Sequence, residues 1–354
     1  MLTTFAQLMV FYTTGQEIAI DSVPANVLRK YNRQMANKDF YTRVTQFSEL
    51  SWVSPPFMDW GDEKDGFILS ADISPHFFIG GEKTRFVLAV NPKYRVRIFR
   101  DNLKFGDSSL PVRTPSFMPS GTIYIPIDLG KHNLYKDIRY LSISLNHHSN
   151  GQDGKTFISP GLFNFYNGNF STNFFEIYFN VNDRRKFKTS TKFICTVDSP
   201  GHGFDTGYYD RVHRFGFEQH VGTAYSQRGT YGRTRIAYKG TLIKVDNHRT
   251  TIKDSLNHKN EFQLGKCYLL EKYRFNLNFS AILDKLENPF NRIEKRINID
   301  LGYYKRISTG NTALFAMVGY YGNDPYNIYY PKNYFFARAG LALGFFVHTS
   351  KLVD

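Results

Sequence analysis

The last hydrophobic segment of the chain, "YFFARAGLALGFFV" at residues 334–347, alternates between two kinds of side chain. Its odd positions are all apolar, namely Phe335, Ala337, Ala339, Leu341, Leu343, Phe345 and Val347. Its even positions include Arg338, Gly340, Ala342 and Gly344. Because successive side chains of a β-strand point to opposite faces, this segment predicts a strand with one uniformly apolar face.

Similar alternating segments recur from about residue 76 onward, and Gly, Asn, Asp or Pro separates them. We predict strands at residues 85–98, 121–128, 138–147, 172–182, 192–197, 212–224, 232–244, 262–270, 273–283, 296–305, 313–321 and 334–347. An even number of about 12 strands suits a closed barrel. The predicted fold class is therefore all-β, a closed antiparallel transmembrane β-barrel of about 12 strands.

Composition favours a membrane barrel over other classes. The chain has 33 Phe and 24 Tyr among 354 residues, and its mean hydropathy is −0.40. No segment approaches the roughly 20 apolar residues that a membrane helix needs, whereas a barrel strand needs only about 10, alternately apolar. A soluble β-sandwich binding module would show the same alternation, but aromatic residues near strand ends favour the membrane form.

The N-terminal part does not follow the strand pattern. "MLTTFAQLMVFYTTGQE" holds a short apolar run, and no Lys or Arg precedes Arg29. We interpret residues 1–15 as a truncated signal peptide, with an ordinary N-terminal strand as the alternative. Residues 16–75 are predicted to be an N-terminal extension with room for a short helix, 76–347 the barrel with a catalytic site on its outer face, and 348–354 a C-terminal tail.

The formal charge of +14 gives little support to nucleic-acid binding. Lys and Arg are scattered through segments such as "NDRRKFK" at 182–188 and form no dense block. A surface that faces anionic lipids fits this distribution as well. The two cysteines, Cys195 and Cys267, allow one disulfide at most and form no zinc ligand set, and the sequence leaves their pairing open.

The stretch "SLNHHSNGQDG" at 144–154 combines histidines with a serine at the end of a predicted strand. His147 and Ser149 continue the apolar row of Leu141, Ile143 and Leu145. If that row faces lipid, the polar pair lies outside the barrel near the membrane interface. Such a pair is badly placed to line a channel and well placed to meet a lipid ester.

A histidine two residues from a serine on one strand face can act as its base, and a third group must orient the ring. Asn173 begins the apolar row of the next strand and can accept the ring N–H. The alternative is a solvated hairpin turn. His148 lies on the opposite row, and we interpret it as polar surface.

The motif Asn146-His147-His148-Ser149-Asn150-Gly151 resembles the N-H-x-S-N-G motif of the outer-membrane phospholipase A family of Gram-negative bacteria. "SSLPVRTPSFMP" at 108–119 is similar to a second segment of that family. "INIDLGYYKRIS" at 297–308, "GYYGNDPYN" at 319–327 and "ARAGLALGFF" at 337–346 resemble its C-terminal half. The similarity covers residues 77–347.

The resemblance implies a barrel that hydrolyses phospholipid acyl esters with calcium as cofactor and acts as a homodimer in the bacterial outer membrane. It implies that Ser149 is the nucleophile, His147 the base and Asn173 the residue that orients it. The Gly151 N–H would help to hold the oxyanion. Phe117 stands where the family has a tyrosine near the acyl chain.

The same resemblance supplies the candidate calcium ligands, which are Ser108, Ser109, Gln152 and Ser171. Gln152 replaces the usual Arg of the family, but this position contributes a backbone carbonyl. The loop before Asn173 is longer than in the family, so Asn164 and Asn167 compete for the orienting role, and Asn169 competes with Ser171 as a ligand.

The leading hypothesis is thus a calcium-dependent phospholipase A1/A2 that meets membrane phospholipids and no nucleic acid. A non-catalytic outer-membrane barrel, either a pore or a structural protein, is the main alternative. The sequence leaves open the acyl position that is cleaved, the head group that is preferred and the stimulus that activates the enzyme.

Overall fold

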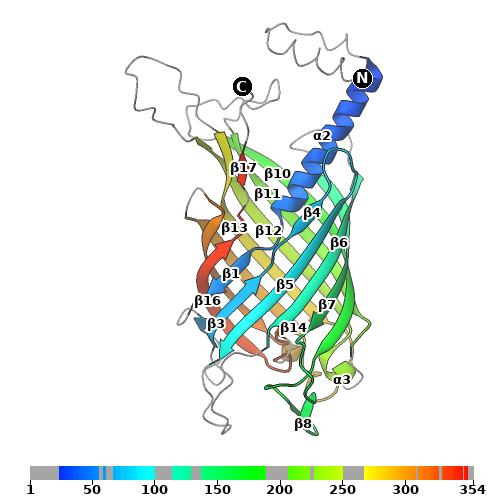
Figure 1. Cartoon of the computed structure of the whole chain (residues 1–354), viewed down its shortest axis with the longest axis vertical. Coiled ribbons are helices and arrows are strands. Elements are labelled where there is room, and N and C mark those ends of the chain that lie inside the picture. Colours follow the sequence, from blue (N-terminus) through cyan, green and yellow to red (C-terminus); the bar gives the residue numbers. More distant parts are fainter. Residues whose placement is uncertain are drawn as a thin grey trace.

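The computed structural model describes residues 24–55, 59–60, 67–99, 114–128, 137–188, 206–223, 227–249, 267–307, 310–326, 329–345 and 347–349. Its centre is a closed antiparallel barrel of 12 strands, which confirms the predicted barrel fold (Figure 1). The strands follow one another around the barrel in chain order, and pairing of Trp52 with Ala342 joins the first to the last.

The barrel strands are β1 (Ser51–Ser54), β3 (Phe67–Ile73), β5 (Val87–Phe99), β6 (Ser116–Asp128), β7 (Ile138–Ser149), β10 (Ser171–Lys188), β11 (Thr206–His220), β12 (Thr234–Arg249), β13 (Cys267–Ile282), β14 (Ile297–Arg306), β15 (Thr312–Tyr321) and β16 (Tyr334–Leu343). The short strands β2 (Asp59–Trp60), β4 (Phe77–Ile79) and β17 (Val347–Thr349) pair with β16, β5 and β13. The remaining elements are α2 (Ala25–Gln46), β8 (Phe157–Ser159), β9 (Leu162–Phe163), α3 (Arg228–Tyr231) and the 3-10 helix η5 (Ile293–Lys295).

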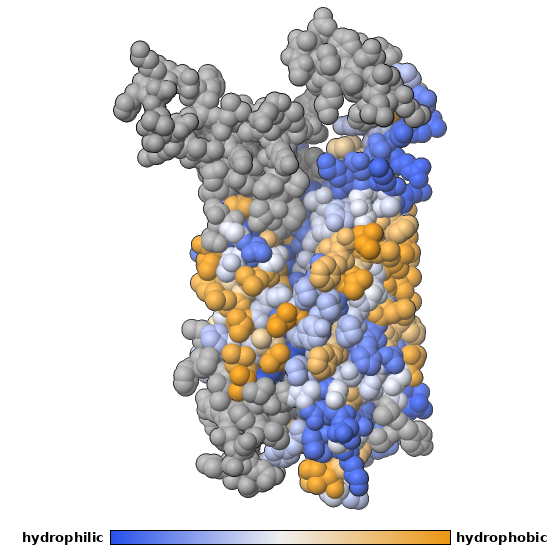
Figure 2. Space-filling model, in the orientation of Figure 1, coloured by the Kyte–Doolittle hydropathy of each residue, from blue (hydrophilic) through white to orange (hydrophobic). Residues whose placement is uncertain are grey.

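Side chains alternate between the two faces of the wall as the sequence predicted. On β16, Phe335 is 77% exposed outside, whereas Arg338 is 3% exposed inside. Exposed apolar side chains recur on the outer face of most strands, including Val90, Ile125, Ile143, Leu145, Ile177, Phe179, Phe215, Phe217, Ile236, Phe275, Leu277, Ile299, Leu301, Leu314, Val318 and Leu341. Figure 2 shows hydrophobic side chains at mid-height on both sides of the view and hydrophilic side chains at the lower end and on α2.

The C-terminal half of α2 lies inside the barrel, at the end opposite β8 and α3 (Figure 1). Phe40 and Val44 pack with Tyr140, Val212 and Ile243 from the inner wall. Carbonyl groups at a helix C-terminus have no partner within the helix, so they need donors from elsewhere.

Arginines of the wall supply those donors. The Arg274 guanidinium donates to the carbonyl oxygens of Gln46 and Ser48 at 2.9 and 2.7 Å. Arg214 donates to the carbonyl oxygen of Phe47 at 2.9 Å. These bonds fix the end of α2 to two strands of the barrel.

Aromatic loops pack together at the opposite end of the barrel. The rings of Phe163 and Tyr330 lie 5.0 Å apart, and those of Phe170 and Tyr231 lie 4.9 Å apart. Phe157, Phe165 and Phe290 surround this cluster. It joins the loops after β7, β11, β13 and β15, so this end of the barrel has an ordered aromatic cap.

The barrel starts earlier than the sequence indicated. Strands β1 and β3 belong to the wall although they lie within residues 16–75, and α2 is a helix of 22 residues rather than a short one. The segments 262–270 and 273–283 join in the single strand β13. The strand predicted at 192–197 and the signal peptide at 1–15 lie outside the described residues, and β17 begins before the tail predicted at 348.

None of the described helices is both long and apolar enough to span a membrane.

Candidate functional site

His147 and Ser149 of the sequence motif lie on the outer face of the barrel, where β7 ends beside the start of β10. In the antiparallel register of these strands His147 lies opposite Asn173, and Ser149 lies opposite Ser171. The Nδ1–H of His147 donates to Oδ1 of Asn173 at 2.7 Å. The structure thus brings together two of the predicted catalytic residues, which are 26 positions apart in the chain.

This hydrogen bond determines which ring nitrogen of His147 can act as a base. A neutral imidazole has one N–H donor and one nitrogen with a free lone pair. Because Nδ1–H is the donor to Asn173, Nε2 is the nitrogen that can accept a proton.

The serine lies on the same outer row as the histidine. Ser149 and His147 are separated by one residue on β7, so their backbones are roughly 7 Å apart along the strand. Among the described residues no hydrogen bond joins the Ser149 hydroxyl to the His147 ring. Contacts between nucleophile and base are often longer before substrate binds, and the shared face permits the bond to form.

The residues after Ser149 form a tight turn that the Asn150 side chain holds. Its Oδ1 accepts the N–H groups of Gln152 and Phe170, each at 3.1 Å, and its amide donates to the carbonyl oxygen of Gly168. Gly151 follows with φ of 62°, a left-handed conformation that favours glycine. Asn150 is a structural residue that sequence reasoning did not single out, although the Asn-Gly pair is a turn signal.

Gly151 is suited to stabilise an anion next to Ser149. It is exposed, and its N–H has no acceptor among the described residues. Phe117 of β6 lies opposite Ser149, and its Cε2 is 3.7 Å from the place where a Cβ on Gly151 would be. The structure therefore brings Ser149, Gly151 and Phe117 close together.

The competing asparagines stabilise their own loop. Oδ1 of Asn164 accepts the N–H groups of Tyr166 and Asn167 at 3.2 Å, and its Nδ2 donates to Oδ1 of Asn167 at 2.6 Å. Asn169 accepts a hydrogen bond from the Thr156 hydroxyl at 2.8 Å. Asn173 is thus the asparagine that bonds to His147.

His148 faces inward, as its row predicted, but its interpretation as polar surface is wrong. It is 6% exposed, and its Nε2 lies 3.3 Å from Oγ of Ser116 inside the barrel. Its ring packs edge-on against Phe170 of the aromatic cap. His148 therefore supports the wall behind the site.

Two of the four predicted calcium ligands lie near Ser149. Ser171 is its exposed cross-strand neighbour, and Gln152 follows the Gly151 turn. Ser108 and Ser109 lie outside the described residues. No group of three or more His, Cys, Asp and Glu in the described part is arranged to hold a metal ion. Hydroxyl and carbonyl oxygens without carboxylates suit a hard cation such as calcium at low affinity.

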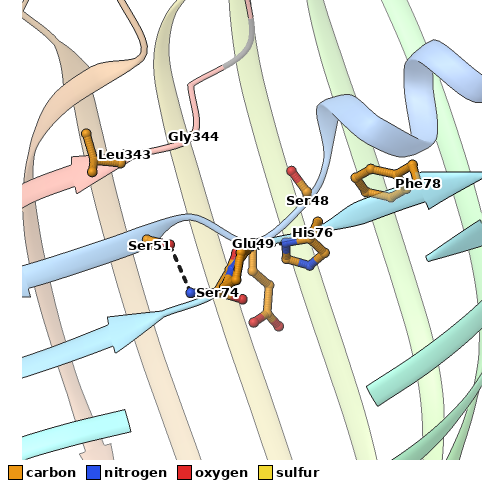
Figure 3. Close-up of a pocket in the computed structure, with 9 residues that line it drawn as sticks. Ser48, Glu49, Ser51, Ser74, His76, Phe78, Leu343 and Gly344 are labelled. Atoms are coloured by element: carbon orange, nitrogen blue, oxygen red, sulfur yellow. Dashed lines mark hydrogen bonds between the residues drawn. The ribbon is translucent and has the colours of Figure 1, made fainter. Parts of the chain in front are cut away.

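A separate hollow of about 300 Å³ lies far from these residues, between the end of α2, the turn after β3 and the end of β16 (Figure 3). Ser48, Glu49, His76 and Leu343 are among the residues that line it. Lys93, whose ammonium is 2.6 Å from the Glu49 carboxylate, keeps the pKa of that carboxyl well below its usual range. The Glu49 carboxylate that lines this hollow is thus ion-paired with Lys93 of β5.

No protein-family model matches this chain, and no curated protein matches it either.

Proposed function

We propose that the chain is a calcium-dependent phospholipase of the bacterial outer membrane, with Ser149, His147 and Asn173 as its catalytic residues. The hydrogen bond between His147 and Asn173 is the observation that carries this proposal, because it orients a base beside a serine on the outer wall. That location is unusual for a polar pair, since Ile143 and Leu145 continue the same row as exposed apolar residues. A lipid ester is the substrate that such a surface meets.

In the proposed reaction the Ser149 Oγ attacks the ester carbonyl carbon while Nε2 of His147 takes its proton. The carbonyl oxygen becomes negative, and the Gly151 N–H donates a hydrogen bond to it. When the carbon–oxygen bond to glycerol breaks, His147 returns the proton to the leaving oxygen. Water then attacks the acyl-serine while His147 takes its proton, and His147 returns that proton to the Ser149 Oγ as the fatty acid leaves.

Asn173 takes no proton in these steps. Its amide oxygen holds the Nδ1–H of His147, which keeps the lone pair on Nε2 in both half-reactions. Bound calcium would add positive charge near the oxyanion. The Ser171 hydroxyl and the Gln152 carbonyl would hold the ion, together with the predicted Ser108 and Ser109.

The inward rows of the described strands carry charged side chains such as Arg97, Arg184 and Arg338, a feature that a pore would share, but α2 fills one end of the described lumen. Phe40, Arg43 and Gln46 of α2 are each 1% exposed within one end of the lumen. At the other end, the aromatic cap joins the loops after β7, β11, β13 and β15. The proposal is tested by fatty-acid release from mixed phospholipid micelles, with calcium and then with excess chelator.

Calcium removal is expected to stop hydrolysis reversibly. Because the predicted ligands carry no carboxylate, the half-maximal rate should need calcium in a range of about 10⁻⁴ to 10⁻³ M. Ser171→Ala should raise that concentration, with Ser159→Ala as a control at an exposed serine of β8, between β7 and β10. Full activity in excess chelator would exclude the calcium role.

Self-association is part of the same proposal, since the resemblance assigns a serine of 108–109 to the calcium site of a second copy. A preparation that sedimentation shows to be monomeric should be inactive, and activity should rise with dimer content.

Leu341→Arg is expected to destabilise the barrel in lipid, because Leu341 is 45% exposed on the outer apolar row. An Arg near the bilayer midplane costs about 2–4 kcal/mol, and one at the interface about 0–1 kcal/mol. Denaturant unfolding in lipid vesicles measures the difference. Leu283→Arg, in the turn after β13, is the control, and equal losses for both variants would contradict a lipid-facing wall.

A further inference from the structure

The turn after β11, residues 221–223, lies against the start of β10. The N–H groups of Val221 and Gly222 both donate to the carbonyl oxygen of Asn173, at 2.8 and 3.2 Å. Asn173 is therefore held through its backbone by one turn and through its side chain by His147. The turn belongs to neither the sequence motif nor the loop that contains it.

The same turn also holds β10 from inside the barrel. Oγ1 of Thr172 lies 2.9 Å from Oγ1 of Thr223 and 3.1 Å from Nδ1 of His220. All three side chains are at most 3% exposed. The His220 ring stacks on Phe174 with centroids 4.4 Å apart. The residues on either side of Asn173 are thus fixed, Thr172 by buried hydrogen bonds and Phe174 by stacking on the buried His220 ring.

Gly222 makes the closest approach to Asn173. A Cβ on Gly222 would lie 2.7 Å from Nδ2, 3.0 Å from the backbone N and 3.1 Å from the Cβ of Asn173. Distances of this kind are shorter than ordinary contacts between heavy atoms. Because backbone atoms are among them, rotation of the Asn173 side chain alone would not relieve the overlap. Position 222 therefore needs a glycine for space.

We propose that Gly222 is a positioning residue for catalysis, which places the Asn173 amide so that its oxygen meets His147. This inference rests on the proposed function. The Nδ2 end of the amide abuts Gly222 while the Oδ1 end bonds to the imidazole. A side chain at position 222 pushes the start of β10 away from the turn, and the amide oxygen moves with it. His147 then loses the bond that keeps its lone pair on Nε2.

Gly222→Ala is expected to lower kcat for micellar phospholipid on the order of tenfold, since a well-placed base contributes about 10²–10⁴ to rate. The KM for lipid should change little, because position 222 binds no substrate. In an Asn173→Ala background the same substitution should cause no further loss, since the amide that it displaces is gone. Gly121→Ala is the matched control, because its Cβ would meet no atom within 4 Å.

The double-mutant comparison separates positioning from a general structural effect. An equal loss in both backgrounds, or a Gly222→Ala variant with the wild-type rate, would overturn the proposal. If Gly222→Ala does not fold, Thr223→Val replaces it, since it removes the Thr172 contact and leaves Gly222 in place. Its loss must likewise vanish in the Asn173→Ala background, and a loss that persists overturns the proposal.

The two proposals fail in different ways. If Ser149→Ala keeps normal hydrolysis, the phospholipase function is wrong whatever Gly222 does. If Ser149→Ala is inactive and Gly222→Ala is not impaired, only the positioning role is wrong.

Discussion

Ser149→Ala is expected to lower the rate of phospholipid hydrolysis by about 10⁴-fold or more while the barrel remains folded. The substitution removes one hydroxyl from a half-buried side chain on the outer wall, so the hydrogen bonds between β7 and β10 persist. Fatty-acid release from mixed micelles measures the activity, and circular dichroism measures the fold. Ser159→Ala, at an exposed serine of β8, between β7 and β10, should keep the wild-type rate.

His147→Ala should be as damaging as Ser149→Ala, and the double variant should be little worse than either single one. When two groups act in one chemical step, removal of one already removes the benefit of the other. The rate losses of the single variants therefore do not add in the double variant. Asn173→Ala should be milder, because the amide orients the base and takes no proton. Near-normal hydrolysis by either Ser149→Ala or His147→Ala would contradict the proposed mechanism.

Arg184→Met should cause the largest loss of stability among the charge substitutions considered. Arg184 is 6% exposed inside the barrel, and its guanidinium donates to Asp210 at 2.6 and 3.0 Å. Asp39 of α2 lies 3.5 Å away. Removing the arginine leaves the buried Asp210 carboxylate without its cation, which costs about 3–5 kcal/mol in a buried pair, whereas Asp39 keeps Arg43 at 3.1 Å.

The adjacent pair on the same two strands provides a matched control. Arg211 donates to Asp183 through two hydrogen bonds of 2.9 Å, but its side chain is 42% exposed. Arg211→Met should therefore cost only about 0–1 kcal/mol. Denaturant unfolding of both variants gives the comparison, and equal losses would show that the inner pair is not desolvated.

Side-chain alternation was sufficient to predict much of this structure. The apolar rows of β7, β10 and β16 face outward as predicted, but the row of β16 does so only as far as Leu343, because Phe345 is 2% exposed and belongs to the buried cluster of Leu50 and Trp52. The same parity put His147 and Asn173 on one face. The antiparallel register of β7 and β10 then places His147 opposite Asn173, which allows their hydrogen bond. The calcium ligands could not be placed in this way, because loop residues follow no alternation.

Two strands escaped detection because their sequences are short. "SWVS" in β1 covers four residues, and β3 covers seven. A strand of so few residues offers too little alternation to identify. By contrast, the sequence pattern predicts two strands where the structure has the single strand β13. The predicted break at residues 271–272 is the point where the register with β12 shifts between Lys244 and Val245. That bulge inserts an extra residue and reverses the parity, which looks like a strand end.

The local sequence of α2 also does not predict that this helix packs inside the barrel. Asp39, Arg43 and Gln46 are buried on this helix, and polar residues predict an exposed face. Their partners Asn182 and Arg184 lie in β10, more than 130 residues along the chain. The role of Gly222 likewise depends on tertiary structure, because a glycine is required there only when the turn after β11 approaches the start of β10.

Covalent labelling tests the identity of the nucleophile most directly. A sulfonyl fluoride with a long acyl-like chain should react with the calcium-loaded protein, and mass spectrometry of its peptides should place the label on Ser149 alone. Labelling should fall sharply in His147→Ala, which lacks the base. Labelling of a different serine would contradict the account. Hydrolysis of phospholipid by the Ser149→Ala variant, with Ser149 of the wild-type protein left unlabelled, would contradict it as well.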